Sequence, residues 1–238
     1  MKKDDLGIKI FADGADIKGM KEMYKTGYVS GFTTNPSFMK KAGVSDYEAF
    51  ALEVVREITD LPLSFEVFSD DFADMEKEAR KIGSWADNVY IKIPVTNTKG
   101  EPSTELIKKL SAEGFKLNVT AVYTVEQVER VVKSLTPCSG AFISVFAGRM
   151  ADSGHNPVPI MKQTADICRG VAGVESLWAS TREVLNVFQA RDCGVDIITA
   201  PNDIIKKLPS TGKSLIELSL DTVRTFYEDA RSSGYRIV

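Results

Sequence analysis

The sequence is short of histidine and cysteine, the side chains that most often bind metals in proteins. Its 238 residues include one histidine, His155, and three scattered cysteines, Cys138, Cys168 and Cys193. An odd number of isolated cysteines argues against a disulfide framework and against a paired metal site, so we expect reduced, mostly buried thiols. Neither a metal nor another cofactor is expected. Because it has no second histidine to act with, His155 is expected in a loop or at a helix start.

Long apolar runs and dense basic runs are also missing. Nowhere do 18 apolar residues stand together, and no signal-peptide pattern follows residues 1–5, so we expect a soluble, cytoplasmic protein that does not bind membranes. The formal net charge is -3 and the basic residues are dispersed, so nucleic acid is not an expected partner. No linker divides the chain, and 43% hydrophobic residues suit one large core, so residues 1–238 are expected to form a single domain.

Short apolar segments typical of β-strands alternate with segments of helical periodicity. Strands are predicted at residues 8–13, 31–35, 63–68, 89–93, 116–120, 141–146, 175–179 and 196–200. Capping-box spacing marks helix starts at Ser45, Thr124 and Ser180. Eight strand–helix units in this length favour a single α/β (β/α)8 TIM barrel. The alternative, a doubly wound open sheet, normally carries a glycine-rich nucleotide turn, and no such motif is present.

Alternation along the predicted strands directs polar side chains to the barrel axis. With the apolar residues facing the helices, the polar residues on the inside are Asp13, Asn35, Ser64, Glu66, Lys92, Asn118, Thr120 and Ser144. A purely structural barrel would fill these layers with branched apolar residues, whereas barrel enzymes carry catalytic residues at the carboxyl ends of the strands. The set therefore favours a catalytic site over unrelated buried or rim residues.

Lys92 lies at the end of the fourth predicted strand, opposite the apolar face of that strand. Lysine is seldom buried without a functional reason. An amine that loses its hydration in an enclosed site is a nucleophile able to form a Schiff base with a carbonyl substrate. The alternative is a lysine whose stem covers apolar surface while its charged end reaches water.

Two arginines follow neighbouring strands and indicate an anion site. Arg149 comes after the sixth predicted strand, and Ser180 and Arg182 come after the seventh, where a helix is predicted to start. Guanidinium groups, hydroxyls and helix N-terminal amides suit a phosphate, which barrels commonly hold in these loops. The alternative is a pair of surface charges, with Arg149 paired to Asp152.

Several motifs resemble those of the transaldolase family, in particular its short members and the related fructose-6-phosphate aldolases. The matching motifs are Thr33-Thr34-Asn35-Pro36-Ser37, Ile91-Lys92-Ile93-Pro94, Asn118-Val119-Thr120, Ser144-Val145-Phe146-Ala147-Gly148-Arg149 and Ala179-Ser180-Thr181-Arg182. They occur in the family's order and on the expected strands. The resemblance implies a (β/α)8 barrel, in agreement with the strand count.

The resemblance also implies a catalytic role for four residues. Lys92 would form a Schiff base with a ketose, and Asp13 would take and return the proton of the substrate hydroxyl. Glu66 and Thr120 would position the water that carries protons during imine formation. Carbon–carbon cleavage would leave a dihydroxyacetone enamine, which a transaldolase passes to an aldehyde acceptor.

Further residues are implied to bind the substrate, which would be a sugar phosphate. Those implied near the sugar are Thr33, Asn35, Asn118, Ser144 and Phe146, and those implied for the phosphate are Arg149, Ser180 and Arg182. The related aldolases carry Gln and Tyr where this chain has Glu66 and Phe146, so the chain matches the transaldolases at both positions.

Three alternatives to a transaldolase of sugar phosphates remain open from the sequence. An aldolase would release dihydroxyacetone to water. A non-catalytic sugar-phosphate-binding barrel would use Lys92 only to pair with Glu66 or Asp13. A sulfonate shares the charge and much of the geometry of a phosphate, so the substrate can also be a sulfosugar.

Short transaldolases resemble one another in forming rings, so a homo-oligomer, either a pentamer or a decamer, is expected. A candidate C-terminal helix spans residues 214–231. Its apolar residues are Leu215, Leu218, Val223, Phe226 and Tyr227. It is expected to pack either on a neighbouring subunit or on its own barrel.

Overall fold

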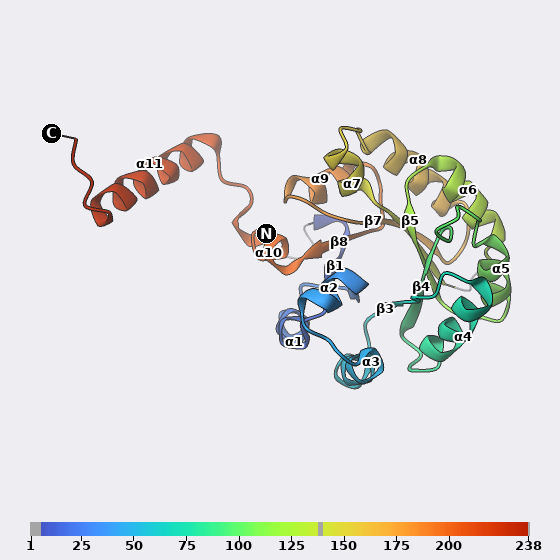
Figure 1. Cartoon of the computed structure of the whole chain (residues 1–238). Coiled ribbons are helices and arrows are strands. Elements are labelled where there is room, and N and C mark those ends of the chain that lie inside the picture. The colour runs from blue at the N-terminus through green and yellow to red at the C-terminus, as the bar shows by residue number, and fades with distance from the viewer. Residues whose placement is uncertain (1–5, 138–139, 238) are drawn as a thin grey trace.

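Eight parallel strands form a closed barrel in the computed structural model, which describes residues 6–137 and 140–237 (Figure 1). The strands follow one another around the barrel in sequence order, and β8 closes it against β1. They are β1 (Lys9–Asp13), β2 (Gly31–Thr33), β3 (Leu63–Glu66), β4 (Val89–Pro94), β5 (Leu117–Val122), β6 (Ala141–Val145), β7 (Val174–Trp178) and β8 (Ile197–Pro201). The predicted (β/α)8 barrel is confirmed, with each strand within two residues of its expected bounds.

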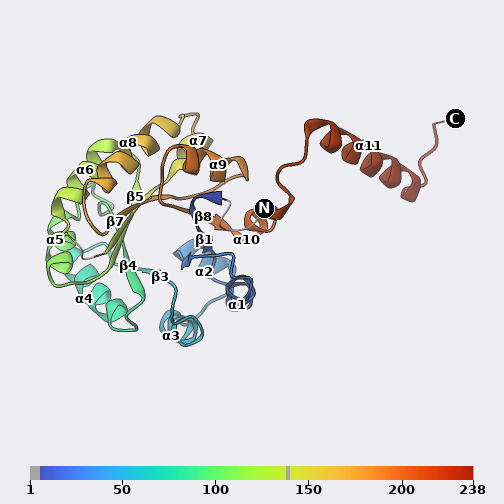
Figure 2. The ribbon, with the colours of Figure 1, turned by 180° about the vertical axis from the view of Figure 1, so that it is seen from behind.

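Helices connect successive strands and cover the outside of the barrel, as Figure 2 shows from behind. They are α1 (Ile17–Lys25), α2 (Pro36–Lys41), α3 (Tyr47–Glu57), α4 (Phe72–Gly83), α5 (Thr104–Ala112), α6 (Val125–Ser134), α7 (Ala147–Asp152), α8 (Val158–Arg169), α9 (Leu185–Asp192) and α10 (Asn202–Ile205). A 3₁₀ turn at Leu208–Ser210 and helix α11 (Leu215–Ser232) follow. In α3, α4, α6 and α8, apolar residues at helical spacing are buried along one face of the helix.

Helix starts agree with the sequence at one predicted cap and differ at another. Thr124 and Gln127 form the expected capping box at the start of α6. Helix α3, in contrast, begins after Asp46, whose Oδ1 accepts a hydrogen bond from the Ala49 amide at 3.0 Å. Asp46 therefore takes the capping position predicted for Ser45, because a carboxylate is an equally good cap one residue further along.

The inside of the barrel is apolar at its amino end and polar at its carboxyl end. Phe142 stacks on Tyr90, with ring centroids 4.0 Å apart, and meets the edge of Phe11 at 5.4 Å. These aromatic rings close the amino end of the barrel. The residues that follow them on the same strands, such as Asp13 and Lys92, line a cavity at the other end.

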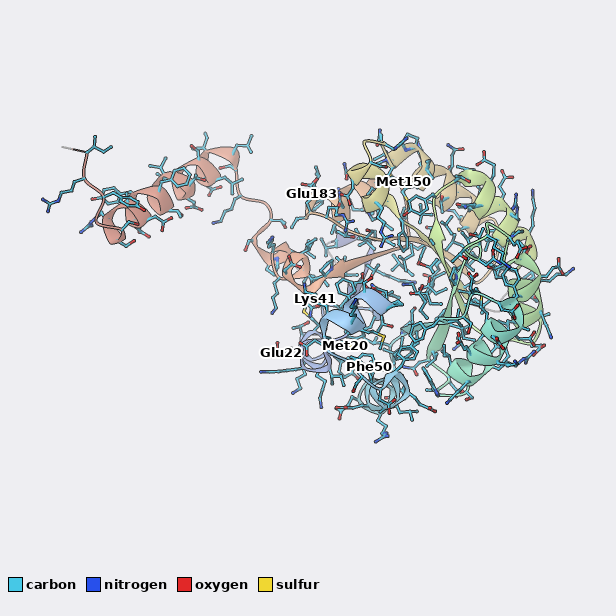
Figure 3. All side chains as sticks on the ribbon, in the orientation of Figure 1. Met20, Glu22, Lys41, Phe50, Met150 and Glu183 are labelled. Atoms are coloured by element: carbon cyan, nitrogen blue, oxygen red, sulfur yellow. The ribbon has the colours of Figure 1, made fainter. Side chains whose placement is uncertain are left out.

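Helix α11 stands away from the barrel (Figures 1 and 2). Ser214 and Glu217 form a capping box at its start, within one residue of the predicted bounds. None of its residues is buried, and Figure 3 shows its side chains apart from those of the barrel. The helix therefore does not cover its own barrel, which excludes that alternative.

The remaining expectations concern isolated residues. Cys168 and Cys193 are free and buried, as expected. Cys138 and residues 1–5 lie outside the described residues. His155 is exposed in the loop before α8, where its Nδ1 lies 3.1 Å from Ser153 Oγ. Within residues 6–137 and 140–237, no helix combines the length and the apolar character needed to cross a membrane.

Candidate active site

A cavity of about 370 Å³ opens at the carboxyl ends of the strands, the end where barrel enzymes carry their chemistry. Except for Ser64 and Asn118, every predicted site residue lines it: Asp13, Thr33, Asn35, Glu66, Lys92, Thr120, Ser144, Phe146, Arg149, Ser180 and Arg182. The structure thus brings residues from widely separated parts of the chain to one space. Its volume suits a small-molecule ligand.

Lys92 projects into this cavity from β4 and is only 6% exposed. Its Nζ donates to the backbone oxygen of Thr34 at 3.0 Å and lies 3.1 Å from Glu66 Oε2. Glu66 is the neighbour of Lys92 in the register between β3 and β4. The amine end is therefore enclosed by protein groups, which excludes the alternative of a lysine that reaches water.

Asp13 ends β1 and lies opposite Thr33 in the register between β1 and β2. Thr33 Oγ1 donates to Asp13 Oδ1 at 2.9 Å. Burial raises the pKa of Asp13 to about 6; Lys92 and the Thr33 hydrogen bond oppose this rise, and Glu66 adds to it. A carboxyl group with this pKa is ionised at neutral pH and is a stronger base than an ordinary aspartate, so it suits reversible proton transfer.

Thr120 and Asn35 also line the cavity, from β5 and from the start of α2. The Thr120 hydroxyl is buried and has no hydrogen-bond partner among the described residues. Asn35 caps α2, and its Oδ1 accepts from the Phe38 amide at 3.0 Å. The cap leaves the Asn35 amide nitrogen for other partners, and the Thr120 hydroxyl can both donate and accept.

Asn118 lies beneath the cavity and is fully buried. Its Nδ2 donates to Ser64 Oγ at 3.0 Å, and its Oδ1 accepts from Ser144 Oγ at 2.6 Å. Ser144 lines the cavity. In this structure Asn118 therefore fixes the orientation of a residue in the cavity wall instead of lining the wall itself.

The two arginines lie at the cavity but have different neighbours. The Arg149 guanidinium lies 5.1 Å from the centroid of the Phe146 ring. Arg182 forms an ion pair with Asp152 at 2.6 Å. Asp152 is therefore the partner of Arg182, where the sequence had suggested Arg149.

The loop after β7 contains Ser180 in a left-handed conformation, with φ of 67°. A capping residue needs an extended backbone, so Ser180 does not cap a helix with Glu183, and that prediction is wrong. Helix α9 begins at Leu185, and Asn186 Oδ1 closes the loop by accepting from the amides of Arg182 and Glu183 at 2.9 and 3.2 Å. Any anion here would meet side chains of the loop, since the helix starts further along.

Gly148 allows α7 and the loop after β7 to approach closely. Its amide donates to the backbone oxygen of Ala179 at 3.3 Å. A Cβ atom at position 148 would lie 1.6 Å from the backbone oxygen of Ser180, well inside any possible contact. Glycine at this position therefore allows Arg149 and Arg182 to lie at one cavity.

Thr199 is a cavity residue that the sequence prediction missed. It is 3% exposed on β8, between Ile198 and Ala200. The alternation that found the polar residues of the other strands would have placed Thr199 inside as well. The missed signal was a threonine in an otherwise apolar strand.

These features define a (β/α)8-barrel protein with an enclosed lysine beside Glu66. Asp13 and two arginines lie at the same cavity. A family model described as transaldolase/fructose-6-phosphate aldolase matches residues 10–237. The chain belongs to this family, as the sequence motifs had indicated.

Two curated relatives align with most of this chain. A protein named "Probable transaldolase" from Dehalococcoides mccartyi is 35% identical over 203 residues, covering 84% of this chain and 90% of the relative. Another of that name from Brucella melitensis is 34% identical over 236 residues, covering 97% of this chain and all of the relative.

A solved structure, that of dihydrodipicolinate synthase from Rhodopseudomonas palustris, superimposes with a TM-score of 0.60 at 12% identity. The match covers 98% of this chain and 80% of that one. At this identity the likeness concerns the barrel fold alone.

Proposed function

We propose that the protein is a transaldolase that moves a dihydroxyacetone unit from a ketose phosphate to an aldose phosphate through a Schiff base on Lys92. The observation that carries the proposal is the enclosed amine, 3.1 Å from Glu66 and in one cavity with Asp13. The names of the two relatives support the same reaction.

The first chemical stage forms the Schiff base. The Lys92 ammonium must lose a proton before it can attack, and Glu66 Oε2 at 3.1 Å is the nearest carboxylate oxygen to accept it. The neutral amine adds to the C2 carbonyl of the ketose, and loss of water from the adduct gives an iminium ion. The buried hydroxyl of Thr120 supplies a donor and an acceptor for that water.

The second stage breaks and remakes a carbon–carbon bond. Asp13 takes the proton of the C4 hydroxyl, the bond between C3 and C4 breaks, and its electron pair moves into the iminium ion to give an enamine. The aldose leaves with a new aldehyde. When an acceptor aldehyde binds, the enamine carbon attacks it and Asp13 returns its proton to the new alkoxide. Hydrolysis of the iminium then frees Lys92.

The arginines and Ser180 would hold the terminal anion of the sugar. Charged donors on two loops of the same cavity can contact an oxyanion from two directions. Asn35, Ser144 and Thr33 also line the cavity and carry groups that can pair with sugar hydroxyls.

Borohydride trapping tests the covalent step. Purified protein is incubated with a ketose phosphate and borohydride, and peptides are then mapped by mass spectrometry. We expect a reduced dihydroxyacetone unit at Lys92, lost in Lys92→Met and kept in Lys109→Met, whose lysine is exposed and paired with Glu76 outside the cavity. A label on another lysine, or no label at all, would overturn the assignment.

An acceptor assay tests the reaction class and the anion. Transfer that depends on an added aldose phosphate supports a transaldolase. Dihydroxyacetone released without an acceptor would instead mean an aldolase. A donor that carries a sulfonate in place of the phosphate, and reacts faster, would identify a sulfosugar enzyme.

We further propose that the protein forms a homo-oligomer, a pentamer or a decamer, through α11. On a helix wheel Ile216, Leu220, Val223 and Tyr227 recur at spacings of four, three and four, with Phe226 beside them. Their side chains are 48% to 82% exposed, an arrangement typical of a helix face that lacks its partner. A neighbouring copy that covers this face would supply the burial that the parent barrel does not.

Light scattering on size-separated protein tests the assembly. Val223→Glu with Tyr227→Glu should shift the mass from a ring of five or ten chains toward smaller species. Thr225→Ala with Asp229→Ala, both exposed and on the opposite face of α11, should leave the mass unchanged. A monomeric wild type, or rings that survive the glutamates, would contradict the proposal.

A further inference from the structure

The hydrogen bond between Thr33 and Asp13 continues to a third residue, Thr199. Thr33 Oγ1 lies 2.9 Å from Asp13 Oδ1 and 2.5 Å from Thr199 Oγ1. Both threonines are buried, at 2% and 3% exposure. Thr33 is on β2 and Thr199 is on β8, and β1 lies between these two strands, so the threonine side chains meet across β1. Thr199 pairs in register with Phe11, which is nearer the amino end of β1 than Asp13 is. A chain of hydroxyl groups therefore supports the carboxylate from beneath.

The chemistry of the three groups fixes the direction of the hydrogen bonds. An ionised carboxylate can only accept, and a threonine hydroxyl has one hydrogen to donate. When Asp13 is ionised, Thr33 donates to it and must accept from Thr199. When Asp13 holds a proton it can donate to Thr33, which then donates to Thr199. The hydroxyl of Thr199 can either donate to Thr33 or accept from it. A group that can only donate would suit the ionised form of Asp13 alone.

We propose that Thr199 is a positioning residue for Asp13 that acts through Thr33, keeping the carboxyl group oriented in both of the protonation states it passes through during proton transfer. Its relevance to the reaction rests on the proposed function, but its effect on the Asp13 carboxyl does not. Two features of Thr199 suit this role: its hydroxyl meets Thr33, and its backbone oxygen accepts separately from Thr181 Oγ1 at 2.7 Å. Changes to the Thr199 side chain therefore leave the backbone contact in place.

Other charged groups act on Asp13 as well. Lys92 on β4 lowers the pKa of the carboxyl group and Glu66 on β3 raises it. Neither is changed by a substitution at position 199. A change in the pKa of Asp13 in a Thr199 variant would therefore come from the hydrogen bonds that run from Thr199 through Thr33.

The direct test is a titration of the Asp13 carboxyl carbon by nuclear magnetic resonance, with the signal assigned by its loss in Asp13→Asn. Thr199→Val keeps the shape and removes the hydroxyl, so the pKa of Asp13 should rise by about 0.5 to 1, because Thr33 donates less strongly without its own donor. Thr199→Ser keeps the hydroxyl and should titrate as wild type does. Should the valine variant fail to fold, Thr199→Ala removes the hydroxyl without adding bulk.

A double variant tests whether Thr199 acts through Thr33. Thr33→Val should shift the titration more than Thr199→Val, and adding Thr199→Val to Thr33→Val should change nothing further. In the transfer assay, Thr199→Val should lower kcat about two- to tenfold, with KM for the phosphorylated donor within about twofold of wild type. Thr199→Ser should restore kcat.

Several results would overturn the inference. A wild-type titration in Thr199→Val, equal defects in the valine and serine variants, or an undiminished effect in the Thr33→Val background would each do so. The titration also separates this inference from the proposed function. A wild type that traps no substrate at Lys92 but shows the shift in Thr199→Val would refute the function and support the positioning role.

Discussion

Arg182 donates to one oxygen of Asp152 from two of its nitrogens, Nε at 2.9 Å and Nη2 at 2.6 Å. The guanidinium holds the pKa of Asp152 below its usual range, so the pair stays charged at ordinary pH. The pair is half-exposed and adds little to stability. Its effect is on position, because it joins the end of α7 to the loop after β7 at the cavity.

This position leads to a prediction about anion recognition. Arg182→Ala should raise KM for a phosphorylated substrate about ten- to a hundredfold, because a charge-assisted contact is lost, and should change KM for the unphosphorylated analogue much less. Arg149→Ala should behave in the same way. Steady-state kinetics on both substrates measures the difference.

Arg169→Ala is the matched control, since Arg169 pairs with Asp166 at 2.8 Å on the exposed side of α8. It should leave both KM values unchanged. Equal losses on phosphorylated and unphosphorylated substrates in the Arg182 variant would mean that this arginine is structural.

Gly148→Ala should disturb the same loop without removing any charge. The added Cβ would lie 1.6 Å from the Ser180 oxygen, so α7 or the loop must move. We expect a loss of roughly 2 to 4 kcal/mol in the free energy of unfolding, typical of severe overpacking, and weaker binding of the phosphorylated substrate. Urea unfolding and kinetics measure the two effects.

Gly170→Ala provides the comparison for this variant, because its Cβ would approach the nearest atom, the Ile167 oxygen, only to 3.3 Å. A small shift there can relieve the contact. If Gly148→Ala unfolds at the same urea concentration as wild type, the backbones of α7 and of the loop after β7 do not lie this close together.

The sequence predicted the strand residues of the site better than the contacts of its loops. Alternation of apolar and polar residues placed Asp13 and Lys92 inside the barrel, because a strand has a period of two whatever surrounds it. The partner of Asp152 could not be predicted, since it depends on how two loops fold against each other. For the same reason the left-handed Ser180 displaced the predicted helix start, which local capping patterns alone had suggested.

The C-terminal helix and Thr199 show two other limits. The bounds of α11 follow from its capping box and periodicity, which are local, whereas its direction away from the barrel is not encoded in any short pattern. Thr199 was within reach of the alternation rule, as a single threonine in an otherwise apolar strand. Its 2.5 Å contact with Thr33, in contrast, depends on how β2 and β8 lie on either side of β1, which no local pattern predicts.

The raised pKa of Asp13 predicts a pH-dependent cost in stability. The carboxyl group loses its proton near pH 4 in the unfolded chain and near pH 6 in the folded protein. Between these values the folded protein binds more protons, so its stability falls as the pH rises. Asp13→Asn removes the effect and should be more stable than wild type at pH 7.5, by about 1 to 3 kcal/mol, with a smaller gap at pH 4.5.

Urea unfolding of both proteins at the two pH values measures this gap. The same pKa predicts that the rate of transfer by wild type rises with pH through about 6, as Asp13 becomes the base. A gap that is equal at pH 4.5 and pH 7.5 would show that Asp13 titrates alike in the folded and unfolded protein.

Glu66 and Phe146 lead to a prediction about the fate of the enamine. Glu66 is held beside Lys92 at 3.1 Å, and the Phe146 ring lies against Arg149 and offers no proton. An enamine that meets no well-placed acid persists until an acceptor aldehyde arrives. Phe146→Tyr adds a phenol as donor, and Glu66→Gln replaces a carboxylate with an amide. The double variant should therefore release more dihydroxyacetone and transfer less.

The ratio of release to transfer, measured with and without an acceptor aldehyde, tests this prediction. Phe146→Tyr alone should carry most of the shift, because only this change adds a donor. Tyr123→Phe is the control, because the ring centroids of Tyr123 and Phe146 lie 5.9 Å apart. Removal of the Tyr123 hydroxyl should leave the ratio unchanged. If wild type already releases dihydroxyacetone as readily as it transfers it, then Glu66 and Phe146 do not protect the enamine, and the protein acts as an aldolase.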